Sequence, residues 1–177
     1  MTGVPDPAAA PAPFTVRRAA SPEDLKACFA LRTEVFVVEQ SVPESVEYDA
    51  HDADAVHVLA VAADGTPLGT GRLLHGPAAL GKTGGPAAGS LGRLAVAAPA
   101  RGLGVGAALV RAIEAEAARL GLAEVTLGAQ VHALGFYERL GYEPYGPAYE
   151  EAGITHRAMR RTLHARDARD ARDARGA

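Results

Sequence analysis

The chain has 177 residues, 48% of them hydrophobic, a length that suits one domain with a sizeable core. Its net charge of −3 disfavours a nucleic-acid partner, because neutralising phosphates requires a basic face. The single cysteine, Cys28, excludes an intrachain disulfide and a cysteine-rich metal site, and no apolar run approaches the roughly 18 residues of a membrane-spanning helix.

The two ends of the chain are predicted to lie outside the folded domain. Residues 1–13 are rich in alanine and proline and lack the basic and apolar regions of a signal peptide, which favours a cytoplasmic protein without a membrane partner. Residues 164–177 repeat the triplet Ala-Arg-Asp without an apolar stripe and are expected to form a solvated tail. The domain is therefore expected to span residues 14–163.

The first half of this domain begins with a short strand predicted over 14–18. Ser21 is typical of an N-cap, with Pro22 at the first helical position, and the helix is expected to run to about Val38. The acidic segment 41–54 follows, and its many carboxylates indicate a solvated loop.

A hairpin comes next, with strands over 56–63 and 67–74 around the turn Ala-Asp-Gly-Thr. The segment 76–89 is rich in glycine, alanine and proline and is expected to be a loop. A further strand is predicted over 90–97.

The longest helix is predicted over 104–120, where the apolar residues recur at helical spacing before Gly121 stops the helix. A strand over 124–128, a short helix over 132–140 and a last strand over 157–163 complete the domain. The order implies one β-α-β crossover in an otherwise hairpin-connected sheet, which indicates a mixed α/β, or α+β, fold.

Three glycine-rich patterns are typical of phosphate binding. Residues 76–83 (GPAALGKT) match a nucleotide-binding loop, but there the lysine and threonine must open a helix, and Gly84, Gly85 and Pro86 disfavour one. Gly102, Gly104 and Ala107 match a dinucleotide-binding pattern, which also requires an acidic residue at the end of the next strand. Glu124 instead stands at the start of its strand, so this interpretation is disfavoured.

The third pattern, residues 101–106 (RGLGVG), uses the same loop differently. A strand ends, the chain turns, and a helix begins whose free amides point at one place and favour an anion. Glycine at 104 and 106 lets a pyrophosphate approach the backbone without a Cβ in the way. This pattern predicts a pyrophosphate-binding loop.

Several segments around this loop resemble the GNAT acetyltransferase superfamily, and the resemblance covers residues 14–163. Residues 91–106 (LGRLAVAAPARGLGVG) are similar to its central strand and pyrophosphate loop, and 135–142 (GFYERLGY) to its late helix. Three more segments resemble the ElaA-like branch: 32–40 (RTEVFVVEQ), 129–133 (AQVHA) and 150–156 (EEAGITH). Relative to that family, the 76–89 segment looks like an insertion.

The resemblance implies a three-layer fold, a mostly antiparallel mixed sheet with the crossover at the cofactor loop, and acetyl-CoA as the acyl donor. It implies that the central strand contacts the pantetheine arm through its backbone, and that the Tyr137 hydroxyl is the general acid for the leaving thiolate. The cofactor-binding residues expected from it are Leu94, Ala95, Val96, Arg101, Gly102, Leu103, Gly104, Val105, Gly106 and Ala107.

The acceptor is expected to be an amine of a small molecule or peptide. An alkylamine has a pKa of about 10.4, so it must lose a proton before it attacks. The candidate bases are Glu39, Glu47, Asp49, Asp52, His57, His132 and His156. Among them His132 and His156 are favoured, because segments that resemble the family bring both toward Tyr137.

Glu39 and Gln40 end the first helical stretch, which in this superfamily borders the acceptor side. Glu47 and Asp49 belong to the acidic loop, which could attract a cationic amine. No metal is expected, because the loop lacks the glycine of an EF-hand.

Two other classes of protein remain open. A non-catalytic acyl-CoA-binding protein keeps the 101–106 loop and does not need Tyr137. A nucleotide- or dinucleotide-binding enzyme needs one of the two disfavoured motifs. The sequence leaves open whether the protein is a monomer or a homodimer, and which amine it modifies.

Overall fold

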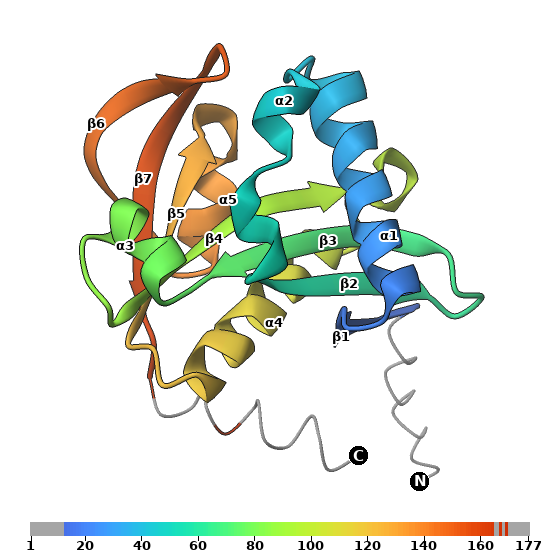
Figure 1. Ribbon diagram of the computed structural model, residues 1–177, viewed down its shortest axis with the longest axis horizontal. Coiled ribbons are helices and arrows are strands. Elements are labelled where there is room, and N and C mark those ends of the chain that lie inside the picture. The colour runs from blue at the N-terminus through green and yellow to red at the C-terminus, as the bar shows by residue number, and fades with distance from the viewer. Residues whose placement is uncertain (1–12, 165–166, 168, 170–177) are drawn as a thin grey trace, which may run out of the picture.

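The computed structural model describes residues 13–164, Asp167 and Arg169. Seven strands form one sheet in the order β1-β2-β3-β4-β5-β7-β6 (Figure 1). The strands are β1 (Phe14–Arg18), β2 (Val56–Ala62), β3 (Pro67–Leu74), β4 (Ala88–Val96), β5 (Glu124–Gln130), β6 (Glu143–Glu151) and β7 (Ile154–Thr162). The α-helices are α1 (Pro22–Arg32), α2 (Glu44–Glu47), α3 (Pro77–Thr83), α4 (Val105–Arg119) and α5 (Leu134–Arg139). Four further turns of helix are the π-helix η1 (Thr33–Glu39) and the 3₁₀ segments η2 (Ala50–Ala53), η3 (Ala98–Ala100) and η4 (Val131–Ala133).

Among the described strands, β4 and β5 are the one parallel pair, and α4 connects them. The other neighbouring pairs are antiparallel. Helices α1 and α2 cover one face of the sheet, and α4 and α5 lie behind it (Figure 1). A mixed sheet between two helical layers, with one crossover, confirms the predicted fold class.

Strand β2 contributes side chains to two hydrophobic clusters, one on each face of the sheet. Val58 and Ala60 belong to the larger core cluster, together with Leu109 and Ile113 of α4. Leu59 and Val61 belong to a second cluster, together with side chains of α1. Alternate side chains of a strand point to opposite faces, so a strand that is buried on both faces is a continuous apolar run.

Most predicted elements are present within a few residues of their expected ends. The hairpin β2–β3, helix α4 and helix α5 match, and Gly121 and Gly141 follow their helices with φ of 77° and 96°. The first helix does continue to Glu39, but beyond Arg32 it widens into the π-helix η1. A π-helical turn is rare and often marks a functional site.

The expected loop over 76–89 was wrong in part, because it contains helix α3. Pro77 stands at the first helical position, and glycines with φ of 62° and 74° flank the helix at Gly76 and Gly84. The buried side chain of Ala79 anchors it. Lys82 and Thr83 therefore end a helix instead of opening one, which is the opposite of a nucleotide-binding loop.

Strand β6 was not predicted from the sequence. Its segment contains Pro144, Gly146 and Pro147, which normally disfavour a strand. β6 is the edge strand of the sheet and is largely exposed, and its pairing with β7 is interrupted by a register shift between Tyr145 and Tyr149. Proline is tolerated at such edges and bulges, because no ladder hydrogen bond is lost there.

The predicted tails, 1–13 and 164–177, lie almost entirely outside the described residues, so their solvated character stays a prediction. Asp167 is described, and its carboxylate accepts hydrogen bonds from Arg161 and from the backbone of His164. No helix in the described part of the chain is both long and apolar enough to cross a membrane.

Candidate active site

The cleft of the molecule opens where β4 and β5 separate. The two strands pair only where residues 88–91 face 124–127. Beyond Leu91, β4 remains paired with β3 as far as Val96, while β5 continues beside β7 to Gln130. The edge of β4 that faces β5 therefore has no strand partner beyond Leu91, and a cleft of about 1380 Å³ opens along it.

A bulge in β4 accompanies this separation. The register against β3 shifts between Thr70 and Arg72, and Arg93 has a φ of 51°. A bulge bends its strand and increases the local twist, which turns β4 away from β5. It also brings the Arg93 guanidinium to α2, where Nε donates to the carbonyl oxygen of Glu47 at 3.1 Å.

The loop between β4 and α4 borders one side of the cleft. Gly102 and Gly104 have φ of 81° and 83°, a conformation that other L-residues rarely adopt. Gly104 is the N-cap of α4, so the amides of Val105, Gly106 and Ala107 have no acceptor within the helix. These amides and the positive end of the helix dipole suit a pyrophosphate.

Gly106 also lies where α4 meets α5, so its lack of a Cβ bears on packing, while the approach of a pyrophosphate stays a prediction. A Cβ at this position would lie 3.3 Å from the Phe136 ring of α5, which is tighter than an ordinary contact. Glycine therefore allows α4 and α5 to pack closely.

The predicted cofactor-binding residues mostly lie together at the cleft. All of them line it except Ala95 and Leu103. Ala95 is buried against the core, and the Leu103 side chain is 57% exposed. Arg101 is held by two contacts: its Nε donates to the Val96 carbonyl oxygen at 3.1 Å, and its Nη2 lies 2.7 Å from Glu39 Oε2. Their roles toward a cofactor stay predictions.

Tyr137 lies on α5 and lines the same cleft. Its ring packs edge-on between Phe136 and Tyr142, with centroids 4.9 and 5.9 Å away. The side chain is buried, and burial raises the pKa of its hydroxyl. Within the described residues no group hydrogen-bonds this hydroxyl. Tyr142 differs, because its hydroxyl donates to Glu114 Oε1 at 3.0 Å.

His132 and His156 both line the cleft, from η4 and from β7. His156 stacks on Tyr149, and its Nδ1 lies 2.7 Å from the carbonyl oxygen of Ile154. Since a carbonyl only accepts, Nδ1 carries a proton, and in the neutral form of the ring Nε2 has the lone pair. His57 is not at this cleft: it is buried, its Nε2 contacts the carbonyl oxygen of Asp52 at 2.9 Å, and burial lowers its pKa.

Glu39 and Gln40 line the cleft at the end of η1, and that they border the acceptor stays a prediction. Glu39 is paired with Arg101, so it joins η1 to the cofactor loop. The Gln40 amide exchanges hydrogen bonds with Gln130 at the end of β5, with Gln130 Nε2 donating to Gln40 Oε1 at 2.9 Å. Gln130 was not singled out from the sequence.

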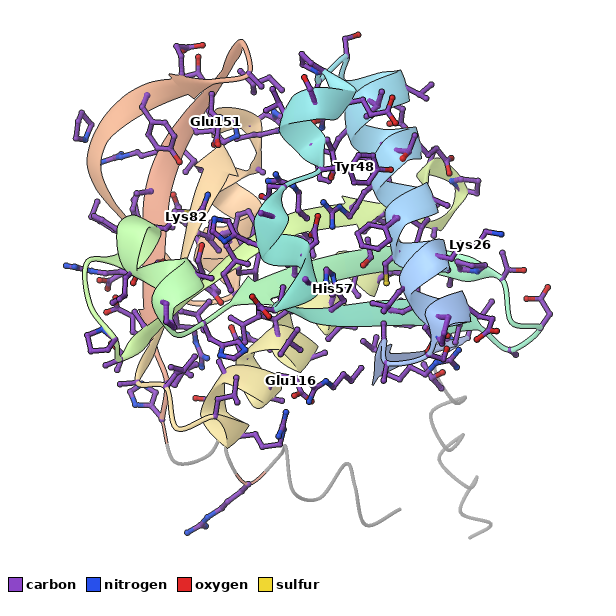
Figure 2. The ribbon with its side chains drawn as sticks, in the orientation of Figure 1. Lys26, Tyr48, His57, Lys82, Glu116 and Glu151 are labelled. Atoms are coloured by element: carbon purple, nitrogen blue, oxygen red, sulfur yellow. The ribbon has the colours of Figure 1, made fainter. Side chains whose placement is uncertain are left out.

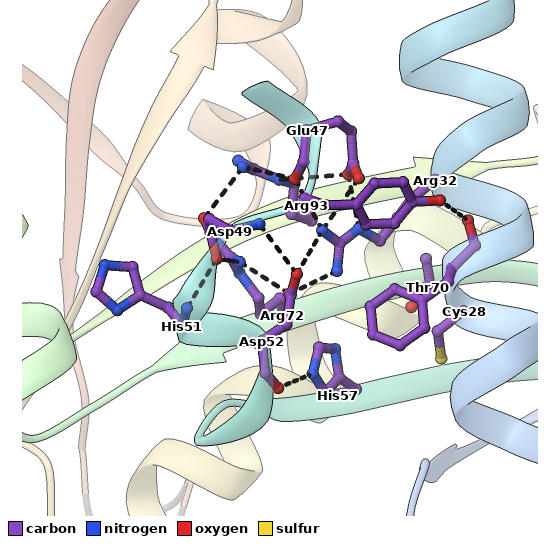
Figure 3. A network of polar contacts seen from close by, with 12 residues as sticks. Cys28, Arg32, Glu47, Asp49, His51, Asp52, His57, Thr70, Arg72 and Arg93 are labelled. Carbon is purple, nitrogen blue, oxygen red and sulfur yellow. Dashed lines mark hydrogen bonds and ion pairs between the residues drawn. The ribbon is translucent and has the colours of Figure 1, made fainter. Parts of the chain in front are cut away.

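The acidic segment 41–54 is only partly a solvated loop, so this prediction was wrong for three of its five carboxylates. Glu47, Asp49 and Asp52 enter a set of ion pairs with three arginines, shown in Figure 3, whereas the side chains of Glu44 and Asp54 are exposed. We call these six residues the ion-pair network: Arg32, Glu47, Asp49, Asp52, Arg72 and Arg93. The segment folds into α2 and η2, which place the carboxylates toward the sheet (Figure 3).

The centre of the network is buried. Arg32 and Glu47 pair at 2.7 Å with side chains that are each 1% exposed. Arg32 Nη1 also pairs with Asp52 at 2.7 Å, and Arg72 pairs with Asp49 at 2.7 Å. Burial raises the pKa of Asp52, but hydrogen bonds from Arg32 and Arg72 outweigh it and lower the pKa to about 2.

Glu47 and Asp49 therefore line the cleft with their carboxylates already paired. The three arginines were not singled out as partners from the sequence. The composition of the segment showed an excess of acid but contained no signal for the helix and the two strands that carry the matching cations.

Comparison with known proteins agrees with this geometry. A model of the GNAT acetyltransferase domain matches residues 16–163. The chain therefore belongs to the GNAT acetyltransferase family, whose members generally transfer an acyl group from acyl-CoA.

Its relatives include ElaA of Escherichia coli, which is 33% identical over 145 residues, covering 81% of this chain and 90% of ElaA. The crystal structure of ElaA gives a TM-score of 0.69 at 29% identity, covering 84% of this chain and 97% of that one. YjcF of Bacillus subtilis, described as an uncharacterized N-acetyltransferase, is 36% identical over 141 residues, 78% of this chain and 93% of YjcF. An acyl-CoA N-acyltransferase from Pseudomonas aeruginosa gives a TM-score of 0.69 at 35% identity, covering 84% and 97% of the two chains. These similarities confirm the ElaA-like branch.

Proposed function

We propose that the protein transfers an acetyl group from acetyl-CoA to an amine of a small molecule or peptide by direct attack. The observation that carries the proposal is the separation of β4 from β5 beside the free amides of α4. The unpaired edge of β4 offers backbone groups to a pantetheine arm, and the helix start offers amides to a pyrophosphate. The two features adjoin in one cleft.

Acetyl-CoA supplies the thioester carbonyl that the amine nitrogen attacks, so that a C–N bond forms and a C–S bond breaks. His156 accepts one proton from the acceptor ammonium at Nε2 before this attack. The Tyr137 hydroxyl donates a proton to the departing sulfur, and the second proton lost by nitrogen restores that hydroxyl. The net products are an amide, a free thiol and one proton.

The Tyr137 hydroxyl is protonated at neutral pH, so it can donate to the departing sulfur. Burial raises the pKa of this hydroxyl, which makes it a weaker acid, so hydrogen bonding to the sulfur as the C–S bond breaks is the main part of its role. His156 is preferred to His132 as the base for a geometric reason. The Ile154 carbonyl oxygen holds Nδ1–H and orients the ring, while no described group holds either nitrogen of His132.

The first test is calorimetric binding of acetyl-CoA, NADH and ATP to the full chain and to Gly104→Val. We expect micromolar acetyl-CoA binding by the native chain, and at least about tenfold weaker binding by the variant. A valine at a φ of 83° strains the loop and places a branched Cβ where the phosphates approach.

Gly65→Val is the matched control, because Gly65 has a φ of 88° and, like Gly104, no atom within 4 Å of an added Cβ. It lies in the β2–β3 turn, so it adds similar strain without touching the cofactor loop. Equal loss of acetyl-CoA binding in both variants would contradict the role of the loop. Binding of NADH or ATP, without measurable binding of acetyl-CoA, would overturn the proposed function.

His156→Gln tests the base. We expect kcat to fall about a hundredfold or more with little change in the Kd of acetyl-CoA, because general-base catalysis contributes about 10²–10⁴. His132→Gln, at the other cleft histidine, is expected to retain most of the activity. If His132→Gln instead causes the larger loss of kcat, the assignment of the base to His156 is wrong.

A further inference from the structure

The half of the cleft away from the cofactor loop has a floor of small residues. Ser90 and Gly92 of β4 and Thr126 and Gly128 of β5 line it. A Cβ added at Gly92 would meet nothing within 4 Å, and one at Gly128 would overlap the hydroxyl of Tyr149. The floor is therefore open beside β4 and covered by the Tyr149 side chain beside β5. We call this half the acceptor chamber.

Most charges around the chamber are already compensated. The ion-pair network contains three guanidinium groups and three carboxylates, so its formal charge is zero. Glu39 is paired with Arg101. The ion-pair network and the Glu39–Arg101 pair therefore present little net charge to an incoming molecule. Recognition of a charged group depends on the charged side chains of the cleft that are not in these pairs.

Lys82 is the cation that remains. It lines the cleft from α3, and within the described residues it forms no ion pair. The chain contains two lysines, and the other, Lys26, lies on α1 away from α3 (Figure 2). Its side chain is exposed at the cleft, and an ammonium without a carboxylate partner among the described residues is available to an anionic ligand.

The backbone of Lys82 is held in place. Ala79, three residues earlier on α3, is buried, and α3 packs against β4. The Thr83 hydroxyl donates back to the Ala79 carbonyl oxygen at 3.0 Å and also contacts Gly85, which fixes the end of the helix. Residues three apart lie on neighbouring positions of a helix surface, so Lys82 stands at the margin of the buried face.

Two carboxylates of β6 line the same cleft as Lys82. Glu150 and Glu151 of β6 line the cleft, and Glu151 forms no ion pair within the part of the chain described. The Glu150 carboxylate accepts a hydrogen bond from the Thr155 hydroxyl. Lys82 and Glu151 lie on the same side of the molecule, where α3 and the β6–β7 hairpin are found (Figure 2).

We propose that Lys82 binds a carboxylate of the acceptor, so that the substrate of this enzyme is an amine that also carries a carboxylate, such as an amino acid or a short peptide. The proposal rests on the proposed acetyl transfer and adds the chemical class of the acceptor. One unpaired ammonium matches a single negative charge, which favours a carboxylate over a phosphate dianion. The glutamates of β6 attract the ammonium end of the same molecule.

The test measures acetylation of glycine, diglycine and triglycine, and compares each free acid with the corresponding C-terminal amide. For the native chain we expect that at least one of the three acids has a kcat/KM about tenfold or more above that of its amide, because the amide cannot form the charge-assisted contact. Lys82→Gln is expected to abolish that preference and leave kcat/KM for the amide unchanged. Lys26→Gln, the matched control, is expected to keep the preference.

Equal kcat/KM for every acid and its amide, or an unchanged preference in Lys82→Gln, would overturn the carboxylate site while leaving acetyl transfer intact. If acetyl-CoA binds but no amine is acetylated, the proposed function fails instead. Calorimetry of diglycine and diglycinamide on the CoA-bound protein then decides the site. Binding of diglycine that weakens about tenfold in Lys82→Gln supports it, and binding that ignores Lys82 refutes it.

Discussion

Tyr137→Phe is expected to lower kcat about a hundredfold to ten-thousandfold while the Kd of acetyl-CoA stays within about twofold. The variant removes the hydroxyl that we assign to protonation of the sulfur and keeps the ring that packs on Phe136 and Tyr142. Stability should not change, because no described group hydrogen-bonds the hydroxyl. Steady-state kinetics, calorimetry and a thermal melt check the three parts of this result.

Tyr142→Phe is the matched control on the same buried aromatic pair. Its hydroxyl donates to the buried carboxylate of Glu114, so its loss is expected to cost stability, about 1–3 kcal/mol, and to leave kcat near the native value. If Tyr137→Phe keeps native kcat, Tyr137 only packs in the core. Acetyl-CoA binding without turnover in the native chain would identify a non-catalytic acyl-CoA-binding protein.

Arg32→Leu is expected to lower the free energy of unfolding by about 3–5 kcal/mol. Glu47 and Asp52 lose a cation that pairs with each of them at 2.7 Å, in a site where the Arg32 side chain is 1% exposed. Among the described residues Glu47 then keeps only Arg93 at 3.3 Å and Asp52 only Arg72 at 2.9 Å, and a buried carboxylate that loses part of its pairing is costly. Denaturation in urea with linear extrapolation measures the change.

The surface pair Arg17–Asp24 supplies the comparison. Its 2.8 Å separation is similar to that of Arg32 and Glu47, but the Arg17 side chain is 53% exposed. Arg17→Leu is therefore expected to cost only about 0–1 kcal/mol. A loss below about 1 kcal/mol in Arg32→Leu as well would mean that the ion-pair network does not contribute to stability as its burial implies.

The backbone geometry of the loop at 101–106 could be predicted because its information is local. Gly102 and Gly104 adopt a positive φ, which glycine allows without strain. The first amides of a helix have no acceptor within the helix, whatever surrounds it. The rejection of 76–83 as a nucleotide-binding loop was also correct, since Lys82 and Thr83 end α3. That the segment forms a helix at all was missed, because Ala79 stabilises it through burial against other elements.

The acidic segment 41–54 shows why the rest of the site could not be predicted. Its carboxylates look solvated when only their neighbours in sequence are considered. Their partners come from elsewhere: Arg32 precedes Glu47 by 15 residues, and Arg93 follows it by 46. Sequence patterns report local periodicity, and they contain no measure of which distant charges the fold will bring together.

The sequence by itself determined the alternation of strands and helices, the single crossover and the loop at 101–106, since these depend on periodicity and on residues with special backbone freedom. Only the tertiary structure decided which side chains share the cleft and in what state. Protonation and pairing depend on every group within a few ångströms, whatever its place in the chain. For that reason only the fold could bury Tyr137, place the Ile154 carbonyl oxygen at His156, and leave Lys82 without an ion pair among the residues that the structure describes.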